Sequence, residues 1–177
     1  MMVAAALLTA CATPRAPSPA DPSLEAWSGR FSADWVEATT PPRQDRASGR
    51  FLLERSEGRT RLEVSSPFGQ TIARAEVSPD RSTIETADGR RHEASSPDAL
   101  TESVLGWKVP VARLPDWLSQ RDGTPTPDDW RVAVERDASG TRRLTLEWPR
   151  DRAGPEAPGV RIRLIVDPPS PAPTDGS

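Results

Sequence analysis

Apolar and polar residues alternate with a period of two along much of this chain, and this pattern most constrains its fold. Six runs show it, at residues 30–35, 50–54, 61–64, 130–135, 143–148 and 160–164. Neighbouring side chains of a strand point to opposite faces, so each run places apolar groups on one face and charged groups on the other. The pattern is typical of an antiparallel sheet with one face in water.

The middle of the chain breaks this alternation and predicts a helix. Ser96 is followed by Pro97 and Asp98, which combines a capping hydroxyl, a proline at the first helical position and an acid in the first turn. Leu100, Val104 and Leu105 then follow at helical spacing, and Gly106 is a typical stop signal.

A second short helix is predicted from near Leu114 and Pro115 to about Gln120. Leu114, Trp117 and Leu118 stand at positions i, i+3 and i+4, and therefore share one face of this helix.

The expected order is about six strands, two short helices and three to four further strands, which is a mainly β (α+β) fold. A twisted sheet of that size with one apolar face must curl or be covered. Two short helices are too small to cover it fully, so the pattern allows a concave apolar surface under a helical lid. A filled β-sandwich suits the same pattern and remains an alternative.

Length and composition limit the classes of protein to consider. With 177 residues, one domain is expected. The 28% of charged residues exclude a polytopic membrane protein, and a net charge of −3 argues against a nucleic-acid partner. Of the 20 prolines, four crowd into residues 14–22 and four into residues 168–173. We therefore expect an extended tether over residues 11–24, a folded domain over 25–166 and a disordered tail over 167–177.

The first eleven residues resemble the signal of a bacterial lipoprotein. Residues 1–10 carry no charge and end at Cys11, the only cysteine. Residues 8–11, Leu-Thr-Ala-Cys, resemble a lipobox, in which the cysteine thiol receives a diacylglyceryl group. This resemblance implies a lipid anchor at Cys11, and Ala12 in place of aspartate implies delivery to the outer membrane. A buried core cysteine is the alternative.

Catalytic and metal-binding motifs are missing from the sequence. The one histidine, His92, stands between Arg91 and Glu93 and is expected to be solvated. A single cysteine excludes a multi-cysteine metal site, and we find no nucleophile elbow, phosphate loop or zinc motif. We therefore expect no enzyme, no metal and no cofactor.

Two aromatic features have more than one interpretation. The six tryptophans border apolar rows, and suit either an ordinary core or a cavity for acyl chains. Phe68 stands between Pro67 and Gly69 at a turn between strands. An exposed phenylalanine is unfavourable unless a partner receives it, so the residues alone favour a ring packed into the core.

Five segments together resemble the LolB family of outer-membrane lipoproteins, namely residues 27–31, 66–71, 88–90, 99–106 and 109–118. The resemblance implies an open, unclosed antiparallel β-barrel covered by short helices, with an apolar cavity between them. It is the fold shared with the periplasmic carrier LolA. The implied function is to receive acylated lipoproteins from such a carrier and insert them into the outer membrane, on its periplasmic side. A carrier of another lipid or glycolipid, and a structural envelope lipoprotein with a filled core, are alternatives.

The resemblance also implies site residues. Phe68, flanked by Pro67 and Gly69, protrudes from the barrel and helps to insert cargo into lipid. The partners implied are a LolA-like carrier, the acyl chains of cargo and the inner leaflet of the outer membrane, and the protein is expected to be a monomer. Candidate cavity-lining residues are Trp35, Phe51, Leu53, Leu62, Val64, Leu100, Val104, Leu114, Trp117, Leu118, Trp130, Leu146, Trp148, Ile162 and Leu164.

Overall fold

The structure is a computed structural model that describes residues 23–119, 126–127, 129–138, 141–151 and 158–168. Within these residues it has six strands, then the helices, then three strands, in agreement with the expected order. The elements are β1 (Glu25–Glu37), β2 (Arg43–Ser56), β3 (Arg59–Ser65), β4 (Thr71–Val77), β5 (Ser82–Thr86), β6 (Arg91–Ala94), α1 (Pro97–Leu105), the 3-10 turn η1 (Val111–Arg113), α2 (Leu114–Leu118), β7 (Arg131–Arg136), β8 (Arg142–Trp148) and β9 (Gly159–Val166).

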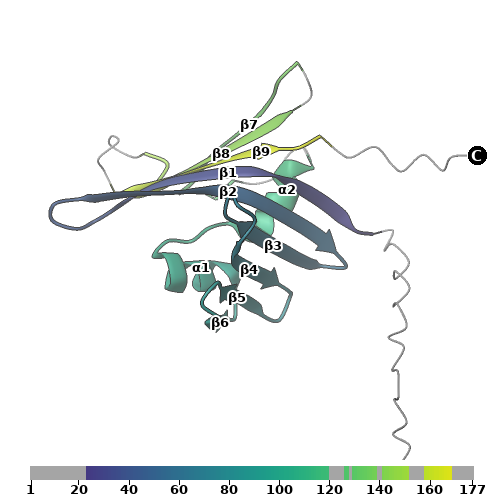
Figure 1. Ribbon diagram of the computed structural model, residues 1–177, viewed down its shortest axis with the longest axis horizontal. Helices are drawn as coiled ribbons and strands as arrows, with labels where there is room; N and C mark the ends of the chain where they lie inside the picture. The colour runs from purple at the N-terminus through teal and green to yellow at the C-terminus, as the bar shows by residue number, and fades with distance from the viewer. Residues whose placement is uncertain (1–22, 120–125, 128, 139–140, 152–157, 169–177) are drawn as a thin grey trace, which may run out of the picture.

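The described strands form one antiparallel sheet in the order β6-β5-β4-β3-β2-β1-β9-β8-β7. Its two edge strands, β6 and β7, do not pair with each other, so the barrel is not closed. Figure 1 shows that β3 to β6 turn away from the plane of β1, β2 and β9, with the helices on the side toward which they turn. The prediction of a mainly β, open barrel covered by short helices is confirmed. The filled β-sandwich is wrong, because one continuous sheet replaces two packed ones.

Two glycines permit the close approach of strands at the centre of this sheet. A Cβ added at Gly29 would lie 2.0 Å from the carbonyl oxygen of Ile165 in β9. A Cβ at Gly49 would lie 1.9 Å from the carbonyl oxygen of Ser65 in β3. Both distances are far too short for a side chain, so the central pair β1 and β2 can lie this close to β9 and β3 only because these residues are glycines.

Helix α1 begins and ends as predicted, because its signals are local. The Ser96 hydroxyl accepts a hydrogen bond from the Ala99 N–H at 3.2 Å, with Pro97 at the first position. Gly106 ends the helix with a φ of 84°, and its N–H donates to the Glu102 carbonyl.

Helix α2 is shorter than predicted and ends at Leu118. The 3-10 turn η1 precedes it directly, which the apolar spacing did not indicate. The Ser119 hydroxyl donates to the Pro115 carbonyl at 2.7 Å, so this side chain satisfies a carbonyl of the last turn. Gln120 lies outside the described residues.

The core occupies only part of the concave face of the sheet. Helix α2 packs on β2 and β8, where Leu53, Leu118 and Leu144 have no exposed surface. Helix α1 instead contacts β5 and β6, near the other end of the sheet. The two helices therefore cover different parts of one apolar face.

Arg55, near the end of β2, connects the beginning of β1 to helix α2. Its guanidinium donates to the Glu25 carboxylate in β1 and, at 2.6 Å, to Asp116 in α2. Only 18% of the side chain is exposed. Burial disfavours the charge, but the hydrogen bonds to Glu25 and Asp116 outweigh this effect and raise the pKa of Arg55 above its ordinary value.

We predict that Arg55→Met lowers the free energy of unfolding by about 2 kcal/mol, because it leaves two carboxylates without their shared cation. Arg61→Met is the matched control, since the Arg61 side chain is 61% exposed and its closest carboxylate oxygens lie 3.6 and 3.9 Å away. This control is expected to change stability by less than about 0.5 kcal/mol. Urea denaturation followed by tryptophan fluorescence measures both, and equal effects would contradict the role given to Arg55.

Candidate functional site

A cavity of about 450 Å³ lies between the concave face of the sheet and the helical segment. Its wall comes from strands β1 to β5, β8 and β9, from helix α1, from the chain between α1 and α2 and from Leu114, the first residue of α2. The lining residues are Phe31, Ala33, Trp35, Glu37, Ala47, Phe51, Leu53, Leu62, Val64, Ile72, Ala73, Ala75, Ile84, Thr101, Val104, Leu105, Trp107, Val109, Val111, Leu114, Leu146, Val160, Ile162 and Leu164.

The wall of this cavity is almost entirely hydrocarbon. Among the described lining residues, Glu37 and Thr101 alone carry a carboxylate or a hydroxyl. The Thr101 hydroxyl is already engaged, since it donates to the Asp98 carbonyl and accepts from the Val109 N–H at 2.8 Å. Such a wall binds by burial of apolar surface, at about 0.8 kcal/mol for each CH₂ group removed from water, and with little preference for shape.

Ten of the fifteen candidate lining residues lie on the wall of this cavity. They are Trp35, Phe51, Leu53, Leu62, Val64, Val104, Leu114, Leu146, Ile162 and Leu164.

The other five candidates lie elsewhere. Leu100, Trp117, Leu118 and Trp130 are buried away from the cavity, the last three in the core cluster around α2. Trp148, at the end of β8, is only partly buried, and its indole N–H donates to Asp129 at 3.0 Å. Side chains on the apolar faces of the sheet and helices divide between core and cavity, and periodicity alone does not separate them.

Sequence reasoning missed two small residues on the wall of the cavity. Ala73 and Ala75 in β4 line it, and Ala75 pairs across the sheet with Leu62 and Ile84. Their alternation with Arg74 and Glu76 was a usable signal for a strand.

The turn between β3 and β4 holds Phe68 away from the protein. The Phe68 side chain is 93% exposed, so the alternative of a ring packed into the core does not hold. The Ser66 N–H donates to the Gln70 carbonyl and the Gly69 N–H to the Ser66 carbonyl, at 2.8 and 2.9 Å. Gly69 has a φ of 83°, which suits glycine in a tight turn.

The Phe68 turn lies beside the mouth of the cavity. The pairing of β3 and β4 shifts register just before this turn, between Val64 and Ser65. Ile72 falls in that irregularity; it lines the cavity and is still 39% exposed. An apolar surface therefore continues from the cavity wall through Ile72 toward the exposed ring.

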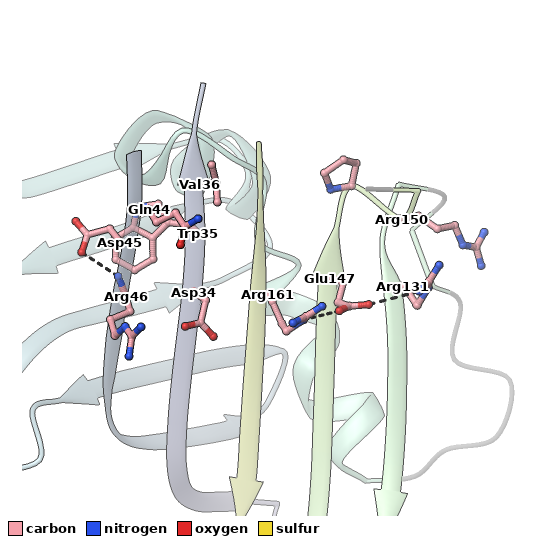
Figure 2. Close-up of a pocket in the computed structure, with 11 residues that line it drawn as sticks. Asp34, Trp35, Val36, Gln44, Asp45, Arg46, Arg131, Glu147, Arg150 and Arg161 are labelled. Atoms are coloured by element: carbon pink, nitrogen blue, oxygen red, sulfur yellow. Dashed lines mark hydrogen bonds and ion pairs between the residues drawn. The ribbon is translucent and has the colours of Figure 1, made fainter. Parts of the chain in front are cut away.

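A second, larger pocket of about 630 Å³ lies on the charged face of the sheet. Figure 2 shows its row of alternating charges across β2, β1, β9, β8 and β7: Arg46, Asp34, Arg161, Glu147 and Arg131. Glu147 pairs with Arg161 and Arg131, and Asp34 pairs with Arg163. The carboxylates of this row are engaged by arginines, which is the arrangement of a solvated sheet face, and we take the apolar cavity as the candidate functional site.

Within the described ranges, no group of three or more His, Cys, Asp or Glu side chains is placed to hold a metal ion. No described helix has the length and apolar character needed to cross a membrane. Cys11, the predicted lipid-attachment residue, lies outside the described residues.

An open sheet curled around a hydrocarbon-walled cavity, with an exposed aromatic turn beside it, is an arrangement suited to binding apolar groups. Residues 26–151 match the family model described as outer membrane lipoprotein LolB. The chain belongs to the LolB family of outer-membrane lipoproteins. Members of this family localise lipoproteins and are not enzymes, so the expectation of a non-enzymatic function is confirmed.

Curated relatives match along most of their length. The outer-membrane lipoprotein LolB of Bordetella petrii is 34% identical over 169 residues, which cover 92% of this chain and 82% of the relative. LolB of Azoarcus sp. strain BH72 is 34% identical, and the alignment covers 93% of this chain and 90% of the relative. LolB of Ralstonia nicotianae is 29% identical, and the alignment covers 93% of this chain and 92% of the relative.

We predict that Ala75→Phe lowers the affinity of the cavity for a fluorescent fatty acid about tenfold, because the added ring displaces space for two or more methylenes. The matched control is Ala133→Phe, which places the same ring on an exposed position of β7 outside the cavity. Fluorescence titration measures both affinities, with circular dichroism to verify folding. An unchanged affinity in Ala75→Phe would show that the probe binds elsewhere.

Proposed function

We propose that this protein receives the acyl chains of lipoproteins from a LolA-type periplasmic carrier and passes them to the outer membrane. The observation that carries the proposal is the hydrocarbon-walled cavity with Phe68 exposed beside its mouth. No nucleotide or metal is required by this scheme, because acyl chains can move downhill from carrier to receiver to bilayer.

The cavity provides the middle step of this downhill transfer, between the carrier and the bilayer. An acyl chain cannot cross water alone, since each exposed CH₂ group is unfavourable by about 0.8 kcal/mol. A cavity of about 450 Å³ shields only part of a triacylated cargo at its present size. Downhill transfer requires this partial burial to bind the chains more tightly than the carrier does and less tightly than the bilayer, where all chains are buried.

Phe68 supplies the contact with lipid. A ring that is 93% exposed on a hydrogen-bonded turn gains free energy by entering an apolar phase, by about 1.5–3 kcal/mol for full burial. Ile72, four residues after Phe68 in the sequence, belongs to the cavity wall and is itself 39% exposed. The inserted turn thereby joins the cavity to the acyl region of the membrane and shortens the path through water.

Cys11 supplies the anchor in this proposal. The signal over residues 1–10 is removed, the cysteine is acylated, and residues 11–24 form a proline-rich tether that holds domain 25–166 at the periplasmic side of the outer membrane. The tail over 167–177 has no assigned role, and the protein acts as a monomer. Several acyl chains on one cysteine give stable attachment, whereas one chain gives marginal binding.

Phe68→Glu tests the insertion step. We expect the rate of cargo transfer to liposomes to fall about tenfold or more, because a carboxylate does not enter the acyl region. The free energy of unfolding is expected to change by less than about 0.5 kcal/mol, since the ring makes little contact with the protein. Leu24→Glu is the control, as Leu24 is 46% exposed and lies beside Ser56 and Arg59, which join β2 to β3, at the opposite end of β3 from the Phe68 turn. Normal transfer by Phe68→Glu would refute the role of this residue.

Cys11→Ala tests the anchor. The variant lacks the thiol that receives the lipid, so we expect it in the soluble fraction after washing of membranes with carbonate, whereas the unchanged protein stays with the membranes. Recovery of Cys11→Ala in the washed membranes would reject lipidation as the means of attachment.

A further inference from the structure

The wall of the apolar cavity contains a hydrogen-bond donor without an acceptor. The indole nitrogen of Trp107 is buried and has no hydrogen-bond partner among the described residues. Trp107 lines the cavity, and its ring lies against Trp35, also on the wall, with 6.0 Å between ring centroids. A buried N–H without an acceptor is unfavourable, and such groups in native proteins call for an explanation.

The cavity itself offers this donor no acceptor. The two oxygen-bearing side chains on its wall are Glu37 and Thr101, and neither accepts a hydrogen bond from Trp107. A hydrocarbon chain offers none either. The head of an acyl chain does, because the ester or amide that joins it to glycerol or to an amine has a carbonyl oxygen.

Trp107 stands where the head of such a chain would lie. It directly follows Gly106, which ends α1, and the neighbouring Leu105 both lines the cavity and is 42% exposed. This part of the wall is therefore near the mouth of the cavity. A chain that enters with its methyl end first would leave its carbonyl group near Trp107.

We propose that the indole N–H of Trp107 donates a hydrogen bond to the ester or amide carbonyl at the head of a bound acyl chain. The inference rests on the proposed function, since it requires acyl chains in this cavity. The nitrogen is covered in the structure, so the proposed contact requires the ring to turn toward the chain on binding. This contact makes the cavity recognise acyl groups in preference to plain hydrocarbon, and fixes how deeply a chain enters.

The test compares two probes of equal chain length, 1-palmitoylglycerol and its ether analogue 1-hexadecylglycerol, which lacks the carbonyl. The unchanged protein is expected to bind the ester about fivefold more tightly, the value of one hydrogen bond. Trp107→Phe keeps an aromatic ring beside Trp35 and removes the N–H. We expect it to bind the ester as weakly as the ether, with the ether affinity unchanged.

Trp117→Phe is the matched control. Its indole nitrogen is also buried without a partner, but Trp117 belongs to the core around α2 and does not line the cavity. This variant is expected to keep the preference for the ester.

Three outcomes would overturn the inference. They are an equal affinity of the unchanged protein for both probes, a preference that survives in Trp107→Phe, and an equal loss for both probes in that variant, which would indicate packing alone. If the unchanged protein binds neither probe, the proposed function fails together with the inference.

Discussion

The whole structure depends on the mismatch between one large apolar sheet face and the two short helices available to cover it. The central strands β1 and β2 pair along their full length, and glycines let β9 and β3 approach them closely. The sheet curls, and α2 fills the concave face over β2 and β8, where leucines lose all exposure. Helix α1 covers the other part less completely. A filled core and a cavity therefore share one apolar surface, and the filled part supports the open part.

The two faces of the sheet differ in chemistry, one charged and one apolar. On the charged face, arginines and carboxylates alternate across the strands and pair with one another, so this face stays in water. On the concave face, hydrocarbon side chains remain available to a ligand. The Phe68 turn is the exception, because it presents a large ring to solvent beside the cavity. In the proposed transfer, an acyl chain that leaves the cavity would pass from its hydrocarbon wall to the exposed ring and then to the bilayer.

Local signals predicted the elements well. The period-two runs located strands in both halves of the chain, and Ser96, Pro97 and Gly106 predicted both ends of α1, because capping depends on neighbouring residues alone. The length of α2 was not predictable to the same degree, since the spacing of its apolar residues indicated neither the 3-10 turn before it nor the Ser119 hydrogen bond at its end.

The candidate site was predictable only in part, for reasons of packing. Trp130 and Ile162 both belong to apolar rows, yet one is buried in the core and the other lines the cavity. The difference depends on contacts between segments that are distant in the sequence, which the alternation of apolar and polar residues does not contain. Phe68 was misplaced by the residue pattern, because the unfavourable exposure of a phenylalanine favoured a ring packed into the core, whereas the ring is exposed. The family resemblance, and not the residue pattern, indicated that the ring protrudes.

The central claim is that acyl chains of cargo lie on the concave face of the sheet. Photocrosslinking from a lipoprotein whose acyl chain carries a diazirine group tests it most directly, with the adducts located by mass spectrometry during transfer. The account predicts adducts on cavity residues such as Leu62, Val64 and Ile162, followed by loss of the adducts once liposomes are added before irradiation. Adducts confined to the charged face, or none on the domain during active transfer, would contradict it.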